Sequence, residues 1–118
     1  MKTILVVDDD ADLQEAMADL LESRGYRVFS TDDGTKALQW LRESEAPCLI
    51  LLDLMMPVMD SHEFLARRNA DLALAAIPLV VITAGLQPKG SVVPGAADVL
   101  YKPFEADALI RIVQRYCD

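Results

Sequence analysis

Short apolar runs alternate with amphipathic stretches along the whole chain. The first run covers residues 4–7 and ends at the three aspartates of residues 8–10. A short β-branched and apolar run bounded by charges is typical of a strand that is buried on both faces. Residues 11–24 then carry leucine and methionine at helical spacing, with Asp10 placed to cap the helix and Gly25 placed to end it.

The same alternation continues to the end of the chain. Further strands are predicted at residues 26–30, at 48–52 with Asp53 as its end, at 79–82 with Thr83 as its end, and at 98–101. Further helices are predicted around Ala37–Leu41, around Phe64 and Leu65 with Asp60 or Ser61 as the cap, and around Leu109–Tyr116. The glycines and prolines of residues 84–97 leave room for only a short or irregular fourth helix. This order predicts one α/β domain over residues 1–118, a doubly wound five-stranded parallel sheet covered on both faces.

Composition and charge narrow the classes of function. The 118 residues carry 11 basic and 19 acidic side chains, a formal net charge of −8, which disfavours nucleic acid and anionic membranes as partners. The apolar start of the chain is too short for a signal peptide, and we expect a soluble cytoplasmic protein. The two cysteines, Cys48 and Cys117, match no zinc pattern, and we expect both to be reduced, although one disulfide is possible.

Polar residues stand where four of the five predicted strands end. These residues are Asp8, Asp9 and Asp10 after the first strand, Asp53 after the third, Thr83 after the fourth and Lys102 after the fifth. In an open parallel sheet, ligands bind beyond the carboxyl ends of the strands, so we expect these side chains to meet in one crevice.

The residue types in this crevice suit phosphoryl transfer onto an aspartate. Asp8, Asp9 and Asp53 would repel one another, so that without a cation at least one of their pKa values should rise. Mg²⁺ relieves such repulsion, since it prefers carboxylate oxygens and keeps several waters. Lys102 adds a cation and Thr83 a hydroxyl for phosphoryl oxygens, while a carboxylate is the nucleophile. We expect Asp10 to act as a helix cap and not as a ligand.

Four motifs in order resemble the receiver domain of two-component response regulators. They are residues 4–10, residues 52–57 together with Asp60, residues 82–84 and residues 102–104. The resemblance covers the whole chain. It implies a flavodoxin-like fold with strand order 2-1-3-4-5 and a phosphorylation switch rather than a metabolic enzyme. The implied phosphoryl donor is a histidine kinase or a histidine phosphotransfer protein.

The same resemblance implies roles for individual residues. Asp53 matches the phosphoacceptor, and Thr83 and Lys102 match the hydroxyl and lysine that contact the phosphoryl group. Asp8 and Asp9 match the acidic pair that binds Mg²⁺ (or Mn²⁺) with Asp53, and Asp9 is favoured as the direct ligand. The backbone carbonyl of Met55 matches a further metal ligand. The resemblance also implies a bond before Pro103 that is often cis, and a downstream protein target. We expect a monomer or weak dimer with no output domain.

Two departures from the family keep alternatives open. Val99 stands where receivers usually carry an aromatic residue, and our hypothesis is that the usual rotamer switch is lost or altered. The segment between Thr83 and Lys102 is also shorter than is common. A pseudo-receiver that docks without phosphorylation is therefore one alternative. An aspartate-nucleophile phosphatase is disfavoured by Met55, which replaces the expected second aspartate, and a flavodoxin-type cofactor carrier is disfavoured by the acidic residues 8–10.

Overall fold

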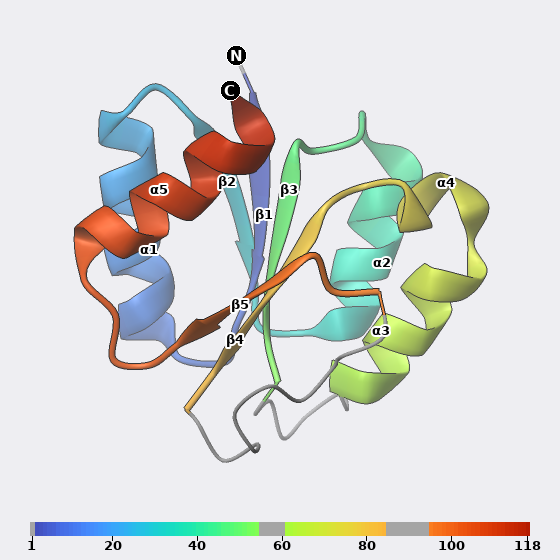
Figure 1. The fold of residues 1–118 in the computed structure, drawn as a ribbon. Helices are drawn as coiled ribbons and strands as arrows, with labels where there is room; N and C mark the ends of the chain where they lie inside the picture. Colours follow the sequence, from blue (N-terminus) through green and yellow to red (C-terminus); the bar gives the residue numbers. More distant parts are fainter. Residues whose placement is uncertain (1, 55–60, 85–94) are drawn as a thin grey trace.

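Five parallel strands form a single twisted sheet in the computed structural model, which describes residues 2–54, 61–84 and 95–118 (Figure 1). The strands are β1 (Thr3–Val7), β2 (Arg27–Thr31), β3 (Leu49–Asp53), β4 (Leu79–Thr83) and β5 (Asp98–Tyr101). Their order across the sheet is β2-β1-β3-β4-β5, and every neighbouring pair is parallel. The expected flavodoxin-like arrangement is therefore confirmed.

Helices cover both faces of this sheet (Figure 1). One face carries α1 (Ala11–Ser23) and α5 (Ala106–Cys117), and the other carries α2 (Gly34–Glu43), α3 (Ser61–Ala70) and α4 (Leu72–Ala75). None of the helices in the described ranges has both the length and the apolar character of a bilayer-spanning segment.

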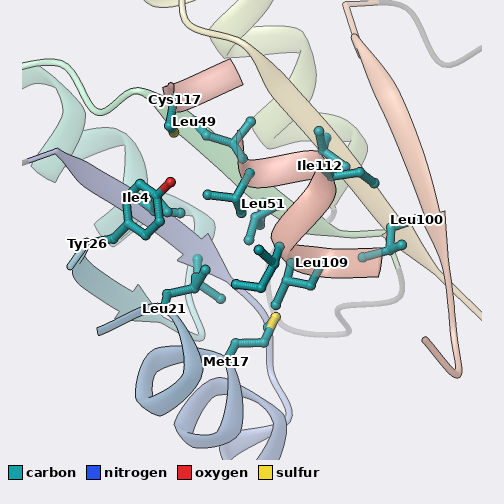
Figure 2. Packing of buried hydrophobic residues seen from close by; sticks show 14 of the residues in the cluster. Ile4, Met17, Leu21, Tyr26, Leu49, Leu51, Leu100, Leu109, Ile112 and Cys117 are labelled. Atoms are coloured by element: carbon teal, nitrogen blue, oxygen red, sulfur yellow. The ribbon is translucent and has the colours of Figure 1, made fainter. Parts of the chain in front are cut away.

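The two faces of the sheet build two separate hydrophobic cores. Successive side chains of a strand point to opposite faces, so Leu5 and Val7 pack with α2 and α3, whereas Ile4 and Val6 pack with α1 and α5. Figure 2 shows the second core, where Met17 and other side chains of the helices meet the strand residues. Burial on both faces explains why the three inner strands β1, β3 and β4 read as nearly continuous apolar runs.

Aspartates cap the amino-terminal ends of three helices. Asp10 accepts a hydrogen bond from the Leu13 amide at 3.1 Å, and Asp33 accepts one from the Thr35 amide at 2.7 Å. At the start of α4, Asp71 accepts a hydrogen bond from the Ala73 amide at 3.0 Å. Each carboxylate satisfies an amide that has no partner inside the helix and also faces the positive end of the helix dipole.

The aromatic pair Phe29–Trp40 joins β2 to α2 and packs against the core formed with α2 and α3. The two rings are stacked, with centroids 4.8 Å apart and planes 5° apart. They line a shallow pocket together with Thr3 and Arg27, the first residues of β1 and β2. The pair therefore lies at the amino-terminal end of these strands.

The four-residue helix α4 was not predicted, because one turn is too short to show a periodic pattern. The expected short fourth helix between β4 and β5 falls mostly on residues 85–94, and the expected Asp60 cap falls on residues 55–60. Both lie outside the described residues.

The expectation of two reduced cysteines is wrong. Cys48 and Cys117 form a disulfide with an S–S distance of 2.09 Å and a Cα–Cα distance of 5.3 Å. Sequence spacing could not reveal this pair, because 69 residues separate the two cysteines and only the fold brings β3 and the end of α5 together.

A buried arginine joins the carboxyl end of α3 to two neighbouring segments. Arg68 is 2% exposed, and its guanidinium donates to the backbone carbonyls of Gly95 at 2.9 Å, Ala75 at 3.2 Å and Ile77. No ion pair formed by the described residues includes Arg68. Burial without a compensating carboxylate lowers the pKa of this guanidinium. Its hydrogen bonds to the backbone carbonyls, and one to Oδ1 of Asn69 at 2.7 Å, hold it in place.

We expect Arg68→Met to lower the free energy of unfolding by about 2 kcal/mol or more, because it leaves buried carbonyls without a donor. Urea denaturation of the variant measures this loss. Arg68→Lys is the matched control, since one ammonium can still donate to some of these carbonyls and should lose less. A methionine variant as stable as the wild type would show that the carbonyls find other partners.

Candidate functional site

The carboxyl ends of four strands place charged and polar side chains together. Asp8 follows β1 directly, Asp53 and Thr83 are the last residues of β3 and β4, and Lys102 follows β5. Carboxylate oxygens of Asp8, Asp9 and Asp53 all lie within 4.8 Å of one another. Asp8, Asp53 and Thr83 are buried, whereas Asp9 is exposed at the rim.

Lys102 provides a cation for this acidic group. Its Nζ lies 3.5 Å from Oδ2 of Asp8 and 3.5 Å from Oδ2 of Asp53. The Lys102 amide also donates to the Thr83 carbonyl at 2.7 Å, which extends the pairing of β4 with β5. The Lys102–Pro103 bond is cis, as the family resemblance implied.

Backbone contacts hold Asp8 in a fixed position. Its amide donates to the Thr31 carbonyl at 3.0 Å, and its Oδ1 accepts from the Asp10 amide at 2.9 Å. The side-chain amide of Gln14 donates to the Asp8 carbonyl. Sequence reasoning missed Gln14, although its place four residues after Asp10, in the first turn of α1, is a signal that could have found it.

Asp8 has a raised pKa, as expected for one carboxyl of this cluster, and burial is the largest cause. Burial, together with the negative charge of Asp53 and a hydrogen bond with it, raises the pKa of Asp8 to about 6. The Asp10 amide and Lys102 act in the opposite direction, but they do not outweigh burial. One carboxyl of the cluster is therefore only partly ionised near pH 6 in the metal-free protein.

The donor set fits a hard divalent cation. Oδ2 of Asp8 and Oγ1 of Thr83 are buried and have no hydrogen-bond partner among the described residues. Buried polar atoms normally have hydrogen-bond partners. The carboxylate oxygen of Asp8 can bind Mg²⁺, and the hydroxyl of Thr83 can donate a hydrogen bond to a phosphoryl oxygen. Asp10 is occupied as the cap of α1. Met55, expected to offer its carbonyl, lies outside the described residues.

An apolar hollow opens beside the acidic cluster. Its volume is about 490 Å³, and it is lined by Leu13, Ala84, Lys102, Pro103 and Phe104. A second hollow continues between α1 and the start of α5, along Met17, Leu20 and Leu109. The rim of the charged site is thus continuous with an apolar groove.

Val99 and Tyr101 lie on the last strand, next to the site. Val99 pairs in register with Val81 and packs against the core formed with α2 and α3. Tyr101 pairs in register with Thr83 and is 39% exposed. The aromatic side chain nearest to Thr83 along β5 is therefore Tyr101, while the effect of Val99 on switching stays a hypothesis.

Comparison with known proteins identifies one family over nearly the whole chain. The family model for the response regulator receiver domain matches residues 4–114. The DNA-binding response regulator MtrA of Mycobacterium leprae is 38% identical over 114 residues, which cover 94% of this chain and 49% of MtrA. An uncharacterised 14.6 kDa protein of Leptolyngbya boryana is 35% identical over 117 residues, covering 97% of this chain and 88% of the relative. The chain thus spans about half the length of the DNA-binding relatives it matches.

Solved structures agree with this result. The receiver domain of the sensor histidine kinase PA1611 from Pseudomonas aeruginosa has a TM-score of 0.86 and 32% identity, covering 98% of this chain and 96% of that one. A magnesium ion is coordinated in its active-site cleft. The chemotaxis response regulator CheY4 of Vibrio cholerae has a TM-score of 0.86 and 26% identity, and 98% of each chain is covered.

Proposed function

Since this chain belongs to the response regulator receiver domain family, we propose that residues 1–118 act as one phospho-accepting receiver unit of a two-component system or phosphorelay. Asp53 accepts a phosphoryl group from the phosphohistidine of a histidine kinase or histidine phosphotransfer protein. The modified domain then changes its binding to a downstream protein. The observation that carries this proposal is the placement of Lys102 Nζ at 3.5 Å from both Asp53 and Asp8, beside a third carboxylate.

The described residues have distinct tasks in this transfer. A carboxylate oxygen of Asp53 attacks phosphorus, an O–P bond forms, and the N–P bond to the donor histidine breaks with its electron pair returning to the imidazole. Lys102 neutralises charge on a phosphoryl oxygen, and the Thr83 hydroxyl donates a hydrogen bond to another. Both groups are fixed by their strands before the donor arrives, so little reorganisation is needed.

Asp8, Asp9 and Asp53 would hold Mg²⁺ (or Mn²⁺), with the Met55 carbonyl as a further ligand. When bound, the ion neutralises the acidic cluster and the phosphoryl oxygens. Asp8 is fixed by the Asp10 amide and by backbone contacts, so it presents Oδ2 toward the cluster. This arrangement supports a switch that catalyses its own phosphorylation and slow hydrolysis, and not a metabolic enzyme.

The groove between α1 and α5 is the docking face we propose for the phosphoryl donor. Its lining includes Lys102, so a helix carrying the phosphohistidine and seated on Leu13 and Phe104 would bring phosphorus to the site. The net charge of −8 favours a protein partner over nucleic acid or an anionic membrane for this chain. We propose that the chain acts in the cytoplasm, as a monomer or weak dimer.

Intact-mass measurement after incubation with acetyl phosphate and Mg²⁺ tests this function. We expect a gain of one phosphoryl group that requires Mg²⁺ and is abolished by EDTA or by Asp53→Asn. Asp19→Asn, which removes an exposed carboxylate of α1, is the matched control and should retain the gain.

Two results would contradict the proposal. A gain that survives in Asp53→Asn would place the phosphoryl group on another residue. No gain with acetyl phosphate, and none with a panel of phosphorylated histidine kinases, would favour the pseudo-receiver, which docks without phosphorylation.

A further inference from the structure

The two cysteines of the chain are joined at the end of the sheet that lies opposite the candidate site. Cys48 directly precedes β3, and Cys117 is the last residue of α5. The described residues contain no free cysteine. We propose that Cys48 and Cys117 form a reversible dithiol–disulfide site, and that its oxidation state controls how firmly the last turn of α5 is held on the sheet.

The position of the disulfide links two elements that lead to the site. β3 begins beside Cys48 and carries Asp53 at its other end, and α5 follows the segment that carries Lys102. Figure 2 places Cys117 next to Leu49, the first residue of β3, and Figure 1 shows the end of α5 far from the carboxyl ends of the strands. A change at the disulfide can therefore act on α5 without entering the acidic cluster.

The last turn of α5 also makes two hydrogen bonds and one ion pair with other parts of the fold. The Tyr26 hydroxyl donates to Asp118 at 2.9 Å, and the Tyr116 hydroxyl donates to the Ala97 carbonyl at 3.3 Å. Arg115 forms an ion pair with Asp98 at 2.6 Å, but the arginine side chain is 62% exposed. Exposed pairs of this kind contribute little, so the disulfide is a stronger restraint on this turn than the ion pair.

The exposure of the two cysteines indicates how the bond opens. Cys117 is 2% exposed, whereas Cys48 is only half-buried. The thiolate of a dithiol reductant attacks Cys48 Sγ, the S–S bond breaks, and Cys117 leaves as a thiolate that takes up a proton. The second thiol of the reductant then releases Cys48, so one disulfide is reduced and one dithiol is oxidised.

In the proposed cytoplasmic location, a reversible disulfide would act as a redox sensor. Disulfides in the cytosol are rare, and those that occur are usually transient, catalytic or redox-sensing. A link that opens under reducing conditions would report the redox state of the compartment through α5, whose first turns line the proposed docking groove.

Alkylation and hydrogen exchange on the folded protein test the inference. Air-oxidised protein should take up no iodoacetamide, even after denaturation, while protein treated with dithiothreitol under native conditions should take up two. We expect amide exchange in residues 115–118 to rise by about tenfold or more on reduction, with β3 unchanged. Removal of the reductant should restore slow exchange.

The Cys48→Ser/Cys117→Ser double variant is the control, and its exchange should match that of the reduced wild type with or without dithiothreitol. Free thiols after air oxidation, a disulfide that opens only in denaturant, or unchanged exchange on reduction would each overturn the inference. None of these readouts depends on phosphorylation, so failure here is distinct from failure of the proposed function.

Discussion

Asp8→Asn should stabilise the metal-free protein at neutral pH by about 3 kcal/mol and remove most of its affinity for Mg²⁺. The carboxyl of Asp8 has a pKa of about 6 in the folded protein, against 3.8 for the free side chain. Each pKa unit corresponds to about 1.4 kcal/mol, and the difference is about two units. Asparagine resembles the protonated acid and can donate to Asp53, so it avoids the cost of a buried negative charge.

The pH dependence of this effect follows from the direction of the shift. The folded state binds the proton more tightly than the unfolded state, so stability from this group is fully present below pH 3.8. It is lost as the pH rises through about 6. The variant and the wild type should therefore have similar stability near pH 4, and the variant should gain an increasing advantage up to about pH 7.

Urea denaturation across this pH range, with and without Mg²⁺, measures both effects. Mg²⁺ should raise the free energy of unfolding of the wild type by mass action and leave Asp8→Asn nearly unchanged. Asp12→Asn, at an exposed position of α1, is the matched control for loss of one negative charge. A metal-free Asp8→Asn protein less stable than the wild type at neutral pH would contradict the raised pKa of Asp8.

Lys102→Met should slow phosphoryl uptake from acetyl phosphate by about 100-fold. Removing one pre-positioned charge or donor from a transition state commonly costs two to three orders of magnitude. The loss should be large here because Lys102 is the cation within 3.5 Å of both Asp8 and Asp53. The time course of the mass gain at fixed Mg²⁺ gives the rate.

Lys102→Arg separates charge from geometry. Arginine keeps the positive charge but has a planar guanidinium with fixed donor directions, so we expect partial recovery of the rate. Circular dichroism on both variants verifies that the fold is retained. Uptake by Lys102→Met at the wild-type rate would remove Lys102 from the proposed transfer.

The parts of the fold that were predicted from sequence are those with strong local patterns. The strands β1, β3 and β4 are buried, mostly apolar runs, and β2 and β5 are partly exposed edge strands. Each of the five was placed within a residue or two of its observed bounds. The amphipathic helices α1 and α5 were recognised for a similar reason. Parallel topology then brings the polar strand ends together, which is why Asp53 and Lys102 could be expected to meet before any distance was known.

The features that escaped prediction depend on contacts between distant segments. The Cys48–Cys117 pair and the carbonyl contacts of Arg68 arise only when separate elements pack, and neither leaves a local pattern. From its residue type alone, Arg68 would be expected on the surface, because burial of an unpaired guanidinium is costly. The strand order also came from family resemblance, since short apolar runs predict parallel pairing but not the sequence of neighbours.

The stacked pair Phe29–Trp40 determines what an optical experiment on this protein can detect. Trp40 is the chain's only tryptophan, and it lies at the amino-terminal end of the strands, away from the acidic cluster. Its fluorescence should therefore respond strongly to unfolding of the β2 edge and little to metal or phosphate at Asp53. Denaturation curves can be followed by intrinsic emission, whereas ligand titrations need an added reporter near Lys102.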